Sequence, residues 1–133
     1  MIKISKRSQY GLRVMAYLVQ NKGFSSVKKI AKEELMPEDF LEKILVKLKL
    51  AGLVKVKYGS GGGYALAVPS SKITVGEIVR PLEGKMALTL CLDRKNKFSC
   101  PHEKGCLTKK IWLKIQNLLD QSMDGILLSE VVS

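Results

Sequence analysis

Apolar residues recur every three to four positions through the N-terminal part of the chain, which is the spacing of one face of an α-helix. The pattern predicts three consecutive helices over residues 8–20, about 26–34 and about 37–50. An Asn-Lys-Gly sequence ends the first helix, and a Ser-Ser pair offers an N-cap for the second. The side chains expected to face the core are Leu12, Met15, Ala16, Val19, Val27, Ile30, Ala31, Phe40, Leu41, Ile44, Leu45 and Leu48.

The helical period gives way to an alternating pattern after the third helix. Residues 53–58 and 63–68 alternate as strands do, and the glycine-rich stretch from Gly59 to Gly63 lies between them. Because glycine adopts conformations that other residues avoid, the stretch predicts the tip of a β-hairpin. A nucleotide-binding glycine loop is the rival interpretation, but it requires a helix after the glycines, where this chain has a strand. Three helices and a hairpin follow the order of a winged helix-turn-helix.

The C-terminal half has a different pattern. Thr74 and Glu77 form a capping-box sequence for a short helix that Pro81 is expected to end. Residues 84–106 show no clear period, and a long helix follows over about 107–121. Its apolar stripe has no evident partner in so small a chain, so we predict a dimer seam rather than an internal core contact. The seam residues are Ile111, Trp112, Ile115, Leu118 and Leu119.

The expected fold is therefore mainly α-helical with a small β-hairpin. We divide it into a winged-helix DNA-binding region with a linker helix (1–83), a cysteine loop (84–106) and a dimerisation helix with a C-terminal segment (107–133).

The net charge of +11 favours a polyanionic partner, and it is concentrated in residues 1–60 at +8, against +3 in residues 61–133. A solvated basic surface is the plainer interpretation of such an excess.

No apolar run is long enough for a transmembrane helix and no secretory signal is evident, so we expect no membrane association and a cytoplasmic location. With one histidine and no nucleophile–base pattern, the sequence does not indicate an enzyme.

Three cysteines, Cys91, Cys100 and Cys106, lie close together in the unpatterned segment. An odd number in a reducing compartment argues against a disulfide framework. Thiolates suit iron–sulfur clusters and zinc alike, so the segment predicts metal or redox chemistry.

Several motifs in order resemble the Rrf2 family of bacterial transcription regulators. They are the opening around 5–13, the helix-to-wing sequence 48–54 with 58–66, the linker-helix sequence 73–79, and Cys-Leu-Thr at 106–108 with a tryptophan at 112. The resemblance implies a homodimeric, sequence-specific regulator of a double-stranded DNA operator, with repression as the expected mode. It also implies a [2Fe–2S] or [4Fe–4S] cluster on three cysteines that senses iron–sulfur status, redox state or nitric oxide. The alternatives are a cluster-free regulator that uses zinc or thiol oxidation, or a regulator that binds a partner protein.

The cysteine spacing departs from that of the cluster-bearing relatives. The first gap, of eight residues between Cys91 and Cys100, is longer than the five residues those relatives more often show. A histidine that follows Cys-Leu-Thr in one branch is Lys109 here. His102 is the main candidate for a fourth ligand, with Glu103, Asp93 and a partner chain's Gln9 as lesser candidates.

Residues on the second and third helices and on the hairpin are the candidates for DNA contact. Glu42 matches the family position implicated in base readout and could accept from a cytosine amino group, while Phe40 suits a thymine methyl. Tyr58 stands where family wings often carry arginine, so it cannot supply that charge to a narrow minor groove. The full set of predicted DNA-binding residues is Lys28, Lys29, Phe40, Glu42, Lys43, Lys57, Tyr58, Gly59, Ser60 and Gly61, with Lys55 as a further phosphate contact.

Overall fold

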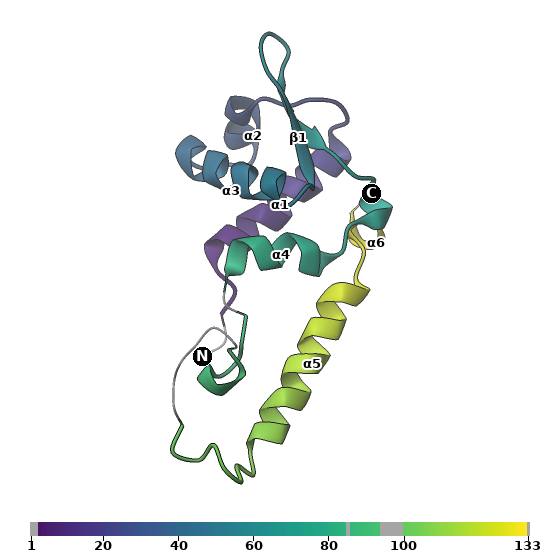
Figure 1. The fold of residues 1–133 in the computed structure, drawn as a ribbon. Coiled ribbons are helices and arrows are strands. Elements are labelled where there is room, and N and C mark those ends of the chain that lie inside the picture. The colour runs from purple at the N-terminus through teal and green to yellow at the C-terminus, as the bar shows by residue number, and fades with distance from the viewer. Residues whose placement is uncertain (1–2, 85, 94–99, 133) are drawn as a thin grey trace.

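The computed structural model describes residues 3–84, 86–93 and 100–132 (Figure 1). The expected winged-helix order is confirmed. The elements in chain order are α1 (Lys6–Gln20), α2 (Val27–Glu33), α3 (Glu38–Leu50), β1 (Val54–Lys57), β2 (Gly63–Leu66), η1 (Ser70–Lys72), α4 (Val75–Glu83), η2 (Leu90–Leu92), α5 (Lys109–Gly125) and α6 (Leu128–Val131).

Local sequence accounts for where most of these helices begin. The Ser5 and Ser26 side chains cap α1 and α2 by accepting hydrogen bonds from backbone N–H groups three residues on. Thr74 and Glu77 form the predicted capping box at the start of α4. Pro37 precedes α3, whose first turn carries Glu38 and Asp39, where acidic side chains favour the helix dipole.

The hairpin is antiparallel, with Val54 opposite Leu66 and Lys57 opposite Gly63. Ser25, in the α1–α2 connection, extends this small sheet through an isolated antiparallel bridge to Tyr64. Gly63 has φ 145°, and a Cβ at this position would overlap the Ser25 backbone. The glycine is thus required both by its own backbone conformation and by the close approach of a neighbouring segment.

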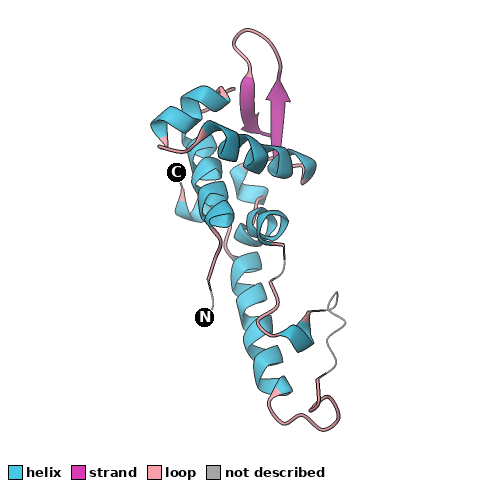
Figure 2. Ribbon diagram, turned by 90° about the vertical axis from the view of Figure 1, so that its left-hand side faces the viewer, coloured by secondary structure: helices cyan, strands magenta, loops and turns pink. Residues whose placement is uncertain are grey.

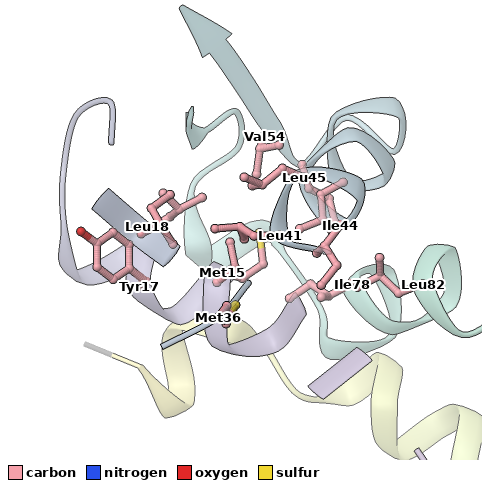
Figure 3. Packing of buried hydrophobic residues seen from close by; sticks show 14 of the residues in the cluster. Met15, Tyr17, Leu18, Met36, Leu41, Ile44, Leu45, Val54, Ile78 and Leu82 are labelled. Carbon is pink, nitrogen blue, oxygen red and sulfur yellow. The ribbon is translucent and has the colours of Figure 1, made fainter. Parts of the chain in front are cut away.

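A single apolar core holds α1–α4 and β1 together (Figure 3). Its centre includes Met15 of α1, Ile30 of α2, Leu41 and Leu45 of α3, and Ile78 of α4, all fully buried. On α1 the buried face differs from the prediction. Val14, Met15, Tyr17 and Leu18 are buried, whereas Leu12, Ala16 and Val19 are only partly buried.

The different face of α1 follows from its contact with α4. A Cβ on Gly11 would overlap Leu82 of α4, so the two helices meet closely where Gly11 has no side chain. This contact turns the Gly11–Val14–Leu18 side of α1 inward. The predicted stripe was displaced by one position because nothing in the local period indicates where another helix will pack.

The predicted end of the linker helix at Pro81 is wrong, since α4 continues to Glu83. Proline removes one helical hydrogen bond. Tertiary contacts keep the last turn helical despite this loss, because Leu82 is buried in the core and the Glu83 carboxylate accepts hydrogen bonds from Ser5 and Ser8.

The C-terminal region forms an arm that extends away from the core (Figures 1 and 2). We call residues 3–84 the body and residues 86–125 the arm. Helix α5 starts two residues later and ends four residues later than the expected span of 107–121, and α6, which was not predicted, follows it. Leu128 of α6 is buried against the body, and Leu127 forms a bridge to Thr74.

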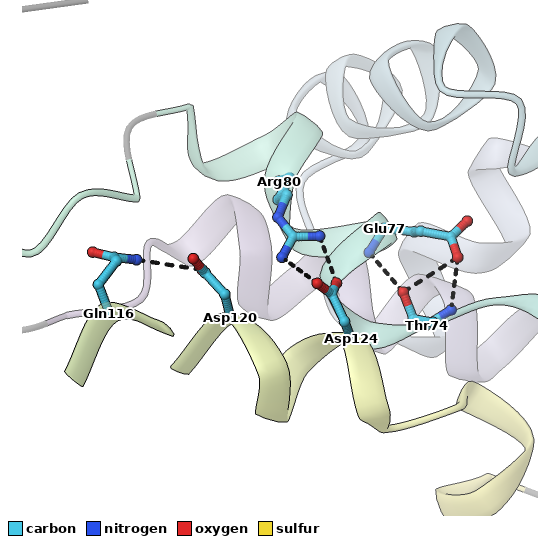
Figure 4. Close-up of polar contacts among 6 residues, drawn as sticks. All are labelled: Thr74, Glu77, Arg80, Gln116, Asp120 and Asp124. Carbon is cyan, nitrogen blue, oxygen red and sulfur yellow. Dashed lines mark hydrogen bonds and ion pairs between the residues drawn. The ribbon is translucent and has the colours of Figure 1, made fainter. Parts of the chain in front are cut away.

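Polar contacts fix the C-terminal end of α5 to α4 (Figure 4). Both guanidinium ends of Arg80 pair with the Asp124 carboxylate, at 2.6 and 2.9 Å. A Cβ on Gly76 would overlap Asp124 and crowd Arg80, so the absence of a side chain on α4 lets the two helices cross closely at this point. Within the described residues, no helix is both long and apolar enough to span a membrane.

Candidate nucleic-acid interface and cysteine site

Helix α3 presents a mixed polar and apolar outer face. Glu42 and Lys43 are exposed there, while Leu41, Ile44 and Leu45 point into the core. A groove of about 800 Å³ runs along this face and is also bordered by Arg7 of α1 and Tyr64 of β2. The size and position of the groove are compatible with contact to an extended ligand along the helix.

Phe40 is partly buried rather than free on this face. Its ring meets Tyr10 of α1 edge-on, with ring centroids 5.5 Å apart. The side chain therefore contributes to packing between α1 and α3, and its contact with a base stays a prediction.

Two further apolar residues of α3, which were not predicted as part of the DNA-binding face, are exposed. Val46 and Leu50 expose 47% and 83% of their surface. They lie four and eight residues after Glu42, and this spacing could have predicted that they share its face of the helix.

The predicted phosphate-binding residues lie on the surface. Lys28 and Lys29 are exposed near the start of α2, and Lys55 and Lys57 are exposed on β1. Tyr58 is 79% exposed, and Gly59, Ser60 and Gly61 form the exposed tip of the wing. The hairpin projects from the same end of the body as α2 (Figure 1). Their contact with DNA remains a prediction.

The three cysteines are brought around one small cavity of about 70 Å³ at the far end of the arm. All three are free thiols. The cavity is also lined by His102, Glu103 and Lys109. Among the described residues, no three acidic, cysteine or histidine side chains are already arranged to hold a metal ion.

Each cysteine sulfur has a local hydrogen-bond partner. The Cys91 sulfur lies 3.0 Å from the Thr89 hydroxyl, and the His102 backbone N–H donates to the Cys100 sulfur at 3.4 Å. Hydrogen bonding from the Thr108 hydroxyl, and then from the backbone N–H groups of Thr108 and Lys109, lowers the pKa of the Cys106 thiol. The thiolate form, which binds metals and reacts with oxidants, is favoured at this position.

The donor set fits a group that takes soft ligands. Three thiols and one imidazole line the cavity, and these are the donor types that iron–sulfur clusters and zinc take. The structure brings His102 to the cavity. Gln9 lies on α1, where its amide donates to the Ile4 carbonyl, and its use by a second chain stays a prediction. Residues 94–99, between the first two cysteines, lie outside the described residues.

The predicted seam residues remain exposed on α5. Ile111, Trp112, Ile115 and Leu118 expose 55%, 41%, 40% and 56% of their surface, and Leu119 is partly buried. Among the described residues of α5, Met123 alone is buried. The helix therefore leaves an apolar stripe uncovered along most of its length.

Polar contacts connect the cysteine site to the body. The Leu88 backbone N–H donates to the Gln116 side chain of α5 at 2.8 Å, and Gln116 in turn donates to Asp120. Figure 4 shows the Gln116–Asp120 contact on α5, the helix that also carries Asp124, the partner of Arg80. The chain itself also connects the two regions over a short distance. Glu83 is hydrogen-bonded to α1, and only two residues separate it from Met86, where the segment leading to Cys91 begins.

Known proteins show a consistent likeness to this chain. A family profile, described as "Rrf2: Iron-dependent Transcriptional regulator", matches residues 4–133. The chain belongs to the Rrf2 family. A sequence relative is the HTH-type transcriptional regulator CymR of Bacillus subtilis, 31% identical over 134 residues that cover 99% of this chain and 91% of CymR.

Two solved structures of family members share the fold. The structure of CymR, the global cysteine regulator of B. subtilis, has a TM-score of 0.80 at 30% identity and covers 98% of this chain and 96% of that one. The structure of T. potens IscR has a TM-score of 0.75 at 34% identity, and the match covers 96% of this chain and 84% of IscR. The winged-helix fold and the role of transcriptional regulator, not enzyme, are thereby established for this Rrf2 protein.

Proposed function

We propose that this Rrf2 protein binds operator DNA as a homodimer and that a cluster on Cys91, Cys100 and Cys106 sets its DNA affinity. The observation that carries the sensing proposal is the convergence of three free thiols and His102 on one cavity at the start of α5. An iron–sulfur cluster bound there would supply a group whose retention depends on iron, oxygen and nitric oxide. The protein's own residues would hold it and connect the site to the body.

The DNA-binding part of the proposal rests on the body. The positive charge is concentrated in the first half of the chain, and the exposed parts of α2, α3 and the hairpin carry lysines. Phosphate contacts from such lysines give affinity that falls steeply with salt. Glu42 and Lys43 on the outer face of α3 are the proposed base-reading residues.

The dimer part of the proposal rests on the uncovered stripe of α5. A second copy of the same helix would bury Ile111, Ile115 and Leu118 against their counterparts, with Trp112 and Leu119 beside them. Such a dimer would place two recognition helices for a palindromic operator.

The arm offers a physical route from the thiol site to the DNA-binding body. The loop is bonded to α5 by Gln116, α5 to α4 by Asp124, and α4 to the α1 N-terminus by Glu83. A change in loop geometry would reach α1 through these three contacts. Allosteric couplings of about 1–3 kcal/mol are sufficient to change operator choice.

Iron and acid-labile sulfide, measured per chain after anaerobic reconstitution, test the sensing proposal. We expect both to be retained by the native protein and lost when Cys91, Cys100 or Cys106 is replaced by alanine. His102→Ala is expected to reduce retention if the imidazole is the fourth ligand. Glu103→Ala removes the neighbouring lesser candidate from the same cavity, and it is expected to leave retention unchanged if the imidazole is the fourth ligand. One zinc per chain without sulfide would instead support the alternative of a zinc site.

Thiol oxidation without a cluster is the second candidate function. The three free thiols around one cavity favour it, and the lowered pKa of Cys106 agrees, because thiolates react with oxidants faster than thiols do. If the protein takes up neither iron nor zinc, and peroxide changes its DNA affinity only when Cys106 is present, this candidate replaces the first.

A further inference from the structure

The tip of the wing has no charge of its own. Residues 59–63 are glycine and serine only, and the Gly62 N–H closes the turn on the Gly59 carbonyl. The nearest cations lie instead on β1, where Lys57 pairs with Gly63 directly beside the tip, and in the last turn of α3. Two aromatic side chains are positioned among them, Tyr58 on one side and Phe24 on the other.

Lys49, in the last turn of α3, reaches across to the wing. Its ammonium lies 5.7 Å from the centroid of the Tyr58 ring and 3.3 Å from the Tyr58 hydroxyl. The ammonium donates to the hydroxyl at the end of the ring and keeps its full charge. A charge from the recognition helix is thereby placed at the position where the sequence itself supplies only tyrosine.

A second pair of lysines surrounds Phe24. The ammonium groups of Lys55 and Lys57 lie 5.7 and 5.9 Å from the centroid of its ring. The two lysines are two residues apart on β1 and so share one face of the hairpin. The backbone bonds between Ser25 and Tyr64 hold the Phe24 segment beside the sheet.

We propose that the DNA backbone is bound along the β1 side of the wing by Lys49, Lys55 and Lys57, and that Tyr58 and Phe24 act as positioning residues for these lysines. The ligand is the phosphate of double-stranded DNA. The inference rests on the proposed DNA-binding function, and it adds Lys49 and two aromatic positioning residues to the phosphate contacts already predicted at Lys55 and Lys57. Each ring limits the freedom of a long side chain before DNA arrives, so less conformational entropy is lost on binding. Each ammonium retains N–H groups that can bond phosphate oxygens.

Salt titrations of DNA binding test the lysines. The probes are a duplex enriched from a random pool by the wild-type protein and an unrelated duplex of mixed sequence. Because phosphate contacts carry no sequence information, both probes are expected to respond alike. Lys49→Ala should reduce the slope of log affinity against log salt by about 1, and the triple change of Lys49, Lys55 and Lys57 by about 3.

Lys114→Ala on α5 is the matched control, since it removes one exposed positive charge at a distance from the hairpin (Figure 1). It is expected to leave the slope unchanged. If the three wing lysines behave like Lys114 while the wild-type protein still binds DNA with a steep salt dependence, this inference is overturned and the proposed function stands. If the wild-type protein binds neither probe, both fail.

A double-mutant cycle tests the role of the rings. Tyr58→Ala should weaken binding in the presence of Lys49 but cause no further loss in the Lys49→Ala variant. Tyr58→Phe keeps the ring but removes the hydroxyl to which Lys49 donates, so its loss of affinity should lie between those of wild type and Tyr58→Ala. Tyr58→Arg in the Lys49→Ala background should restore the lost salt slope, which a purely structural role of Tyr58 would not produce.

Phe24→Leu applies the same logic to the other ring, because leucine keeps an apolar side chain without an aromatic face. Its effect should disappear when Lys55 and Lys57 are alanine. Equal losses with and without the lysines would show that the aromatic residues act on DNA independently of them, and would overturn the positioning role.

Discussion

The body and the arm use their apolar residues in opposite ways. In the body, α1, α3 and α4 bury theirs in one shared core, as Met15, Leu45 and Ile78 illustrate (Figure 3). In the arm, Ile111 and Leu118 remain more than half exposed on a helix of 17 residues. A helix with an uncovered apolar stripe gains little by folding alone. The body therefore carries a core of its own, whereas the apolar stripe of the arm would be covered only by the dimer contact proposed above.

The largest expected effect separates core leucines from arm leucines. Leu45→Ala removes a fully buried side chain and should lower the free energy of unfolding by about 2–5 kcal/mol. Leu118→Ala, at 56% exposure, should cost far less in a dilute, monomeric sample. Denaturant titration of both variants at several protein concentrations measures the difference. A large loss for Leu118 that does not depend on concentration would contradict the distinction.

Charge placed in the stripe should break the dimer and spare the body. Ile115→Glu would bury an unpaired carboxylate at the proposed seam, at a cost of about 3–5 kcal/mol. Sedimentation should then show a monomer, while the far-ultraviolet circular dichroism keeps its helical signal. Lys114→Glu, at the neighbouring exposed position, is the matched control. A variant that remains dimeric would place the seam on another surface.

Two glycines at helix crossings sharpen the comparison further. Gly11→Ala would force a methyl group into packed Leu82 and should cost about 1–3 kcal/mol. Gly76→Ala meets the exposed side chains of Asp124 and Arg80, which can move aside, so its cost should be smaller. Thermal unfolding ranks the two variants. The reverse order would mean that the α4–α5 crossing is as rigid as the core.

The smallest effect concerns pH and the Glu83 contact. Burial raises the pKa of Glu83, but hydrogen bonds from Ser8 and Ser5 outweigh it and lower the pKa below its usual value. A lowered carboxyl pKa contributes stability above the unfolded value of about 4.3, and the contribution is lost as pH falls through the folded value. Glu83→Gln should remove this part of the acid sensitivity. Unfolding free energies of both proteins between neutral pH and about pH 3 provide the test, and identical pH dependence would refute it.

Local sequence alone determined the order of elements, because each signal acts within a few residues. The Ser5, Ser26 and Thr74 caps and the glycine stretch fixed helix starts and the hairpin without distant contacts. The clustering of Cys91, Cys100 and Cys106 was also visible, as was His102 between them. All of these features depend on sequence neighbours.

Tertiary structure decided which face of α1 is buried, where α4 ends and which side chains from separate elements are in contact. Leu82 set the buried face of α1 through Gly11, and the bonds from Ser5 and Ser8 to Glu83 helped carry α4 past Pro81. Lys49 reached Tyr58 only because α3 packs beside the hairpin. The free energy of such contacts depends on distances between separate elements, and a period or a cap carries no information about those distances.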